Sequence, residues 1–120
     1  MNSSFRDLRV WHHAMDLALE TYQGTANFPK QEIYGLAQQM RRAAVSIPSN
    51  IAEGKGRCTD KDFRRFLFQA RGSLLELETQ IVLAVKLQYL SEAQSRKLQS
   101  LAMQVARSLA GLINALASAA

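Results

Sequence analysis

Positively charged side chains are concentrated in one stretch of the chain, residues 41–71. This stretch holds eight arginines and lysines against three acidic residues, and the whole chain of 120 residues has a net charge of +5. All of the net charge therefore lies in this stretch, and the rest of the chain is neutral. Because arginine and lysine neutralise phosphate groups, the stretch predicts a surface for RNA, DNA or another acidic partner.

The best candidates for this surface lie in a predicted turn and on the outer face of the helix that follows it. They are Lys55, Arg57, Lys61, Arg64, Arg65 and Arg71. Phe68 lies among them and offers either a ring for base stacking or an apolar contact between subunits. The same cations can also be ordinary solvated side chains. Upstream, Arg41 and Arg42 can add to the surface or form weak ion pairs with glutamates. The glutamates considered are Glu53, Glu76 and Glu78.

Three other patterns partly resemble a zinc site, a nucleotide-binding loop and a nucleophilic cysteine, but none has all the residues that such a site requires. His12 and Asp16 are one helical turn apart, yet two ligands do not complete a zinc site. The run Gly54-Lys55-Gly56-Arg57 lacks the spacing of a nucleotide-binding loop and follows a helix, not a strand. Cys58 has no base or carboxylate at a defining distance in the sequence. We therefore expect no enzymatic activity, no metal and no cofactor.

Size and composition indicate an ordinary folded protein. The apolar fraction is 48%, the mean hydropathy is −0.14, and 120 residues suit a single domain over residues 1–120. The single cysteine excludes an internal disulfide. The longest uncharged run, residues 108–120, is shorter than the roughly 20 residues that span a bilayer. We therefore expect a cytoplasmic protein with no membrane partner.

The spacing of apolar residues predicts an all-α fold, an up-down-up-down antiparallel four-helix bundle. The helices are expected at about residues 7–23, 29–54, 59–89 and 91–117. The predicted core stripe of the first helix is Leu8, Trp11, Met15, Ala18 and Tyr22. That of the second is Ile33, Ala37, Met40, Ala44, Ile47 and Ile51. That of the third is Phe63, Leu67, Ala70, Leu74, Leu77, Ile81 and Ala84. That of the fourth is Leu98, Leu101, Val105, Leu109, Leu112 and Leu116.

Several residues predict how these helices begin, bend and end. Pro29 is expected to start the second helix, and Pro48 is expected to kink it without ending it. Gly54 and Gly56 offer left-handed positions at its end. Thr59 is a natural cap for the third helix, and Ser91 with Gln94 has the spacing of a capping box for the fourth.

The third helix has a second apolar stripe that its own bundle does not need. Phe68, Leu75, Val82 and Tyr89 recur every seven residues and lie well away from the core stripe on a helical wheel. A helix that is apolar on two faces needs two partners. This stripe therefore predicts an oligomer interface.

Four motifs carry a family resemblance over about residues 5–89. They are Phe5-x-x-Leu8-x-Val10-Trp11; Tyr34-Gly35-Leu36 followed by Gln39-x-Arg41-Arg42-Ala43; Ser46-Ile47-Pro48-Ser49-Asn50-Ile51-Ala52-Glu53-Gly54-x-Gly56-Arg57; and Phe66-Leu67-x-x-Ala70-x-Gly72-Ser73-Leu74-x-Glu76. The chain thereby resembles the small bacterial four-helix-bundle proteins encoded in intervening sequences of 23S ribosomal RNA genes. The resemblance implies a ring-like homopentamer. It also implies kinship with the accessory protein of diversity-generating retroelements, a basic pentamer that binds nucleic acid and a reverse transcriptase.

Together these observations predict a non-catalytic, homo-oligomeric bundle that binds RNA or DNA through its basic surface. The alternative is a protein-interaction scaffold or adaptor, for example for a reverse transcriptase, with no direct role in nucleic-acid binding. An acidic protein would then occupy the same cations.

Overall fold

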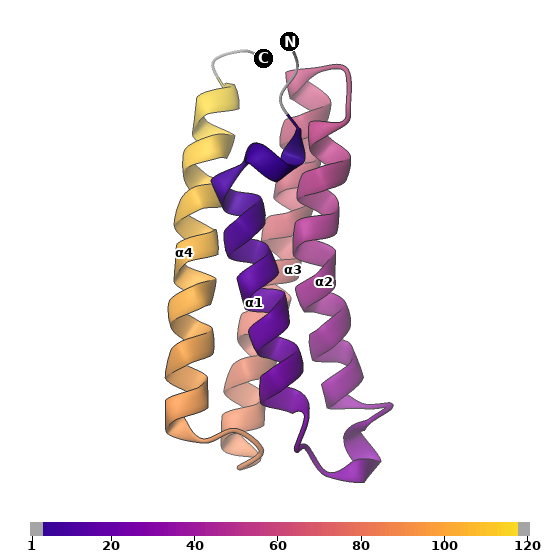
Figure 1. The fold of residues 1–120 in the computed structure, drawn as a ribbon, viewed down its shortest axis with the longest axis vertical. Coiled ribbons are helices and arrows are strands. Elements are labelled where there is room, and N and C mark those ends of the chain that lie inside the picture. Colours follow the sequence, from indigo (N-terminus) through magenta and orange to yellow (C-terminus); the bar gives the residue numbers. More distant parts are fainter. Residues whose placement is uncertain (1–3, 118–120) are drawn as a thin grey trace.

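Four long α-helices and two short 3₁₀ helices make up the computed structural model, which describes residues 4–117 (Figure 1). The elements are η1 (Phe5–Asp7), α1 (Arg9–Thr25), η2 (Lys30–Glu32), α2 (Leu36–Lys55), α3 (Asp60–Lys86) and α4 (Glu92–Ala117). No strand occurs among the residues that the structure describes, and the all-α prediction is confirmed. The molecule measures 46 × 23 × 20 Å.

The helices lie side by side along the long axis. Figure 1 shows α1 and α3 running in one direction and α2 and α4 in the other. α1 packs against α2 and α4, and α3 packs against the same two helices. The core therefore lies on the bundle axis, where each helix contributes one apolar stripe.

The predicted core stripe is confirmed in full for α3, whose seven residues are all buried. In α2 the stripe is buried except for Ile33, which precedes the helix and is exposed. In α4 the members Leu98, Val105 and Leu109 are buried, and the rest are partly buried against the core. In these three helices the regular spacing of apolar residues was enough to identify the buried face.

For α1 the predicted stripe lies on the wrong side of the helix at two positions. Met15 and Tyr22 are exposed, whereas Ala14, Leu17 and Thr21 are fully buried. Small residues let α1 approach its neighbours closely, and the Thr21 hydroxyl is satisfied by donating to the Leu17 carbonyl at 2.8 Å. Hydrophobicity favours a methionine over a threonine in the core, so the sequence pattern could not identify this face.

The second helix begins at Leu36 and not near residue 29. Pro29 precedes the short helix η2 instead, and Gly35 has a non-helical conformation with φ −114° and ψ −120°. The Glu32 carboxylate then accepts a hydrogen bond from the Leu36 amide at 2.9 Å. Pro29 and Glu32 do mark the start of a helix, but that helix is the 3₁₀ helix η2 and not α2.

The third helix ends at Lys86, three residues before the predicted boundary. Gln88 adopts the left-handed conformation with φ 65°. The amides of Gln88 and Tyr89 donate to the carbonyls of Val85 and Ala84, both at 2.9 Å. This is a Schellman arrangement, in which a left-handed residue ends the helix and satisfies its last carbonyls.

Pro48 lies inside α2, which is continuous from Leu36 to Lys55. Two residues before the proline, the Ser46 carbonyl accepts a hydrogen bond from the Asn50 side chain at 2.9 Å, and the Ser46 hydroxyl lies 2.9 Å from that of Ser73 on α3. These polar side chains hold the helix next to the proline. The kink at Pro48 stays a prediction.

Gly54 and Gly56 do not end α2 in the way the sequence predicted. No glycine in the described chain has a positive φ, and Gly56 is right-handed with φ −78°. Gly54 is needed because α3 lies very close to α2 at this point. A Cβ atom at residue 54 would lie 2.7 Å from Phe66 Cβ and 2.9 Å from Phe63 Cδ1. The α2–α3 turn can therefore be tight because Gly54 lets α3 approach.

Both predicted helix caps are present. The Thr59 hydroxyl accepts from the Asp62 amide at 3.1 Å at the start of α3. At the start of α4, Ser91 and Gln94 exchange two hydrogen bonds of 3.0 and 3.1 Å, which completes the capping box. Among residues 4–117, no helix is both long enough and apolar enough to cross a bilayer.

Candidate nucleic-acid interface

Five of the six predicted phosphate-binding residues lie together at one end of the bundle. Lys55 ends α2, Arg57 lies in the α2–α3 turn, and three cations lie in the first two turns of α3. These three are Lys61, Arg64 and Arg65. Arg71 is exposed but lies about 16 Å further along α3 than the first helical residue, at 1.5 Å per residue. We call residues 54–65 the turn end.

Aromatic rings support the cations at the turn end. The guanidinium carbons of Arg57 and Arg65 each lie 4.7 Å from the ring centre of Phe66, and Lys55 Nζ lies 5.8 Å from that of Phe63. Both rings are buried and lie beneath the charged groups, so we call Phe63 and Phe66 the aromatic floor. Attraction between a cation and a ring face is worth about 0.5–1 kcal/mol at exposed sites and restricts where the charge can point.

Phe63 is a predicted core residue, and Phe66 has no predicted role beyond the family motif. Their support of the cations was missed because it depends on the turn folding Arg57 back over α3. The signal in the sequence was that Arg64 and Arg65 lie between Phe63 and Phe66. Charged and apolar residues also mix in this way in any amphipathic helix, so the pattern does not by itself predict that the rings support the cations.

The cations line two surface hollows at the start of α3. One hollow, of about 440 Å³, is formed by the α2–α3 turn and includes Lys55, Arg57 and Cys58. The other, of about 420 Å³, is lined by Lys61, Arg64, Arg65 and Phe68. Hollows with cationic walls can hold a phosphate or a carboxylate of a partner.

Two of the arginines are engaged within the molecule. Arg64 is half-buried, donates from Nε to the Ile113 carbonyl of α4 at 3.2 Å, and has its guanidinium carbon 5.1 Å from the Phe68 ring centre. Arg65 is 3.8 Å from Asp62, but both side chains are about half exposed, so this pair is weak. Arg64 therefore has a bridging role between α3 and α4, while Arg65 is available to a partner.

Arg41 belongs to a different part of the structure. Its Nε donates to the Thr25 hydroxyl at 2.8 Å, its Nη2 donates to the Tyr22 carbonyl at 3.3 Å, and its guanidinium covers the Tyr22 ring. It thus binds the carboxyl end of α1, where a cation is favoured by the helix dipole. Arg42 is exposed and shares a polar hollow between α2 and α3 with Glu76.

The remaining reactive side chains have ordinary contacts. His12 Nε2 lies 2.7 Å from the Arg6 carbonyl, and His13 Nδ1 lies 3.1 Å from the Ser108 hydroxyl. Cys58 is a free, exposed thiol. Within residues 4–117, no group of three or more His, Cys, Asp or Glu side chains is placed to hold a metal ion.

The predicted oligomer stripe is exposed at three of its four positions. Phe68, Leu75 and Val82 are each about half exposed. Tyr89 lies apart from them, because α3 has already ended: its hydroxyl donates to Glu32 Oε2 at 3.0 Å, and its ring centre lies 5.2 Å from that of Phe28. The hydrogen bond to Glu32, then burial and the carboxylate charge, raise the pKa of Tyr89. Tyr89 therefore joins the α3–α4 connection to the α1–α2 connection within one chain.

Comparison with known proteins identifies the family. A family model described as 23S rRNA-intervening sequence protein matches residues 6–111. The chain is also similar to the crystal structure of a protein of unknown function from the S23 ribosomal protein family of Bacteroides thetaiotaomicron. The TM-score is 0.78 and the identity 21%, over 87% of this chain and 97% of that chain. This similarity concerns the fold alone.

No curated protein matches the chain. The family model, however, spans nearly the whole bundle, from η1 well into α4. It includes the turn end and the exposed stripe on α3. The chain belongs to the 23S rRNA-intervening sequence protein family.

Proposed function

We propose that this chain is a non-catalytic, homo-oligomeric cytoplasmic protein that binds RNA or DNA through the turn end. The observation that carries the proposal is the gathering of cations there with few anions to neutralise them. Lys55, Arg57, Lys61 and Arg65 lie within one turn and the helix turns beside it, and within residues 4–117 the weak Arg65–Asp62 contact is the only ion pair that any of them forms. Such a cluster attracts the phosphate backbone without regard to sequence.

The aromatic floor explains how this surface would work. A guanidinium held over a ring makes no hydrogen bond to it through its outer N–H groups, and these can donate to phosphate oxygens in pairs. Because Phe66 fixes both Arg57 and Arg65, binding costs less side-chain entropy than it would for free arginines. Several copies in one oligomer would bind one strand at several points and so gain avidity.

The test is a titration of labelled single-stranded RNA and DNA with the wild type and two charge-reversal variants. Lys61→Glu with Arg65→Glu removes exposed cations from the turn end. Lys86→Glu with Arg96→Glu makes the same change in net charge at the other end of the bundle. We expect the first variant to lose at least about tenfold in affinity at low salt and the control to lose much less.

The salt dependence of the nucleic-acid affinity gives a second test of the same surface. For single strands the slope of log K against log[salt] falls by about 0.7 for each phosphate contact removed, so the turn-end variant should have a slope shallower by about 1.4. Equal losses in both variants would contradict a localised surface. No binding by the wild type at low salt would contradict the proposal and favour the alternative, a scaffold for an acidic protein.

A further inference from the structure

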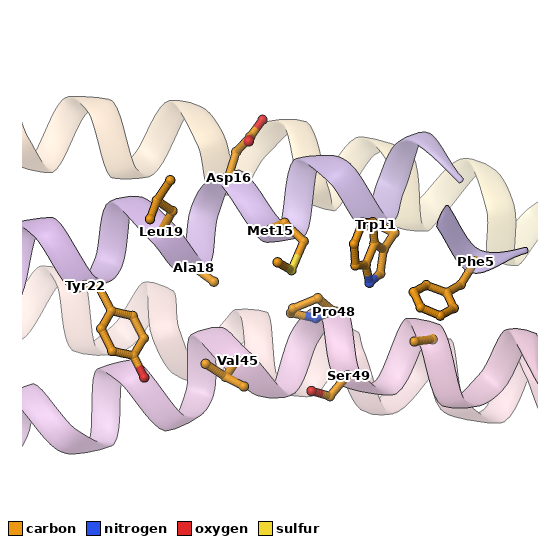
Figure 2. A pocket seen from close by; sticks show the side chains of 11 residues that line it. Phe5, Trp11, Met15, Asp16, Ala18, Leu19, Tyr22, Val45, Pro48 and Ser49 are labelled. Atoms are coloured by element: carbon orange, nitrogen blue, oxygen red, sulfur yellow. The ribbon is translucent and has the colours of Figure 1, made fainter. Parts of the chain in front are cut away.

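Two hollows of opposite chemical character border α2. Between α1 and α2, side chains such as Met15 and Val45 line an open apolar hollow (Figure 2). Between α2 and α3 lies a polar hollow of about 360 Å³, which we call the α2–α3 hollow. Its lining residues are Gln39, Arg42, Ala43, Ser46, Ser73 and Glu76. A volume of roughly 300–1,000 Å³ with a few convergent polar groups is typical of a ligand-binding site.

Hydrogen bonds within the chain fix one end of the α2–α3 hollow. Asn50 Nδ2 donates to the carbonyl and the hydroxyl of Ser46, at 2.9 and 3.0 Å, and the Ser46 and Ser73 hydroxyls lie 2.9 Å apart. The contact between the two serines uses one of their two hydroxyl protons. The other proton has no acceptor within residues 4–117, so the pair offers a ligand one O–H donor.

The polar groups toward the other end of the hollow are unpaired. Within residues 4–117, neither Arg42 nor Glu76 forms an ion pair or a side-chain hydrogen bond. Gln80 is only 7% exposed, and its Oε1 is buried with no hydrogen-bond partner in the same part of the chain. Gln80 follows Glu76 by one helical turn, and side chains on a helix lean toward its amino terminus, which here is the direction of the hollow. A ligand that donates to this buried oxygen would therefore be favoured.

Arg42 and Glu76 lie at the same height on two walls of the hollow. α2 and α3 run in opposite directions, and Ser46 meets Ser73 between them (Figure 1). Arg42 precedes Ser46 by four residues and Glu76 follows Ser73 by three, so both lie about 4.5–6 Å from this contact along the bundle. One wall therefore offers a guanidinium that can donate two parallel hydrogen bonds, and the other a carboxylate that can accept two.

Among the four RNA bases, guanine has the groups that these two walls require. Its O6 and N7 accept two hydrogen bonds from one guanidinium, and its N1–H and N2 amino group donate two to one carboxylate. Adenine and cytosine present only one donor group on the Watson–Crick edge, beside an acceptor nitrogen, and the N3–H of uracil lies between two carbonyl oxygens. The carboxylate of Glu76 would repel these acceptors and so discriminate against the other three bases.

A stripe of exposed residues on α3 connects the hollow to the turn end. Its members lie on one face of the helix, because they follow one another at intervals of four, three and four residues. They are Arg65, Gln69, Gly72 and Glu76. The distance from Arg65 to Glu76 along the helix is about 16.5 Å, which about five nucleotides of a stacked strand would span.

Gly72 provides independent support along this stripe. It lies in the middle of α3, where glycine is disfavoured relative to alanine. A Cβ atom at Gly72 would meet nothing within 4 Å, so packing inside the chain does not require a glycine. The missing side chain leaves room for a strand to lie against the helix between the turn end and the hollow.

We propose that the α2–α3 hollow binds a guanine base of the strand whose phosphates contact the turn end. Arg42 donates to O6 and N7 of the base, and Glu76 accepts from N1–H and the N2 amino group. The serine O–H and Gln80 Oε1 add one donor and one acceptor beside them. The inference rests on the nucleic-acid binding of the proposed function and adds a base preference to it, because phosphate contacts alone carry no sequence information.

The test compares two short labelled RNAs that differ at one base. One contains only adenosine and cytidine, and the other has a single guanosine in place of a central adenosine. We expect the wild type to bind the guanosine strand about tenfold more tightly, since a good bidentate pair discriminates between bases by at least this order. Glu76→Gln and Arg42→Gln should each remove most of this preference. Glu78→Gln, the same replacement on another face of α3, is the control and should keep it.

A strand with inosine in place of the guanosine tests the contact of Glu76 with the base. Inosine lacks the N2 amino group but keeps O6, N7 and N1–H. The wild type should therefore bind the inosine strand several-fold more weakly than the guanosine strand. Glu76→Gln should bind the two strands with nearly equal affinity, because its side chain no longer offers two acceptors.

The base preference and the phosphate contacts are measured separately. Equal affinity of the wild type for the adenosine and guanosine strands, or a preference that survives Glu76→Gln, would overturn the inference. Either result would leave the phosphate surface standing, because that surface is tested by the affinity of Lys61→Glu with Arg65→Glu for the strand without guanosine. No binding of any strand at low salt would overturn both proposals. Arg42 and Glu76 are exposed, and circular dichroism will verify that their variants keep the fold.

Discussion

The charged side chains at the two ends of the bundle differ in whether they bind other parts of the same chain. At the end that holds the α1–α2 and α3–α4 connections, which we call the closed end, Arg41 binds α1 and Glu32 joins the start of α2 to Tyr89. At the turn end, Arg57 and Arg65 lie over the Phe66 ring and stay exposed. These contacts at the closed end hold segments of one chain together, whereas the turn-end cations other than Arg64 are available to a partner.

This difference shows why counting charges is not enough. In the sequence, Arg41 and Arg57 belong to the same basic stretch and are equally good candidates for binding phosphate. The structure gives Arg41 two hydrogen-bond acceptors and a ring, whereas the Arg57 side chain lies against the Phe66 ring and has no hydrogen bond or ion pair within residues 4–117. Two of the N–H groups of Arg41 are already used within the chain, so Arg41 has fewer donors to offer a phosphate than Arg57 has.

The largest effect on stability is expected at the turn end, from the close approach at Gly54. Gly54→Ala would force Cβ against Phe63 and Phe66, and overpacking of this kind costs about 1–3 kcal/mol. Gly56→Ala is the control, because its Cβ would lie 3.5 Å from the nearest atom, the Glu53 carbonyl oxygen. Urea denaturation should show a loss for the first variant and a change near zero for the second. Equal losses would mean that the turn, and not the contact with α3, requires glycine.

The comparison between the two ends is tested directly by Arg41→Ala and Arg65→Ala. Loss of the hydrogen bonds of Arg41 should cost about 1–2 kcal/mol of unfolding free energy, whereas Arg65→Ala should cost less than about 0.5 kcal/mol. Nucleic-acid affinity should respond in the opposite way, falling for Arg65→Ala and staying near the wild-type value for Arg41→Ala. Urea denaturation and a low-salt titration of both variants measure the two effects. If Arg41→Ala weakens binding as much as Arg65→Ala does, the division between the ends is wrong.

Much of the fold could be predicted because it depends on local patterns. The buried stripe of α3 and the caps at Thr59 and Ser91 follow from residue type and spacing alone. The buried face of α1 could not be predicted, because it is defined by small residues such as Ala14 and by Thr21, whose hydroxyl is satisfied within the helix. Met15, Leu19 and Tyr22 remain exposed on α1 and line an open apolar hollow beside α2, so the wrong assignment of the buried face also hid this surface.

The candidate site could be predicted in its composition but not in its arrangement. The basic stretch was evident, yet the separation of Arg41 from the turn end requires knowing where each helix meets its neighbours. Tyr89 continued the seven-residue repeat of Phe68, Leu75 and Val82, and nothing in that repeat shows that Gln88 ends the helix before it. Glutamine is rare in the left-handed conformation, so the sequence gave no reason to stop there.

Gln88 itself offers the smallest test, at the closed end. Its φ of 65° is a conformation that costs L-residues about 1–2 kcal/mol and glycine almost nothing. Gln88→Gly should therefore stabilise the protein by about 1 kcal/mol, after the higher entropy of glycine in the unfolded chain is subtracted. Gln69→Gly, the same replacement inside α3, should destabilise by a similar amount. Opposite shifts in the urea midpoint would confirm that the Schellman turn fixes the end of α3. A loss in both variants would mean that the Gln88 side chain contributes more than its strained backbone costs, and that Tyr89 is held by its contacts with Glu32 and Phe28 instead.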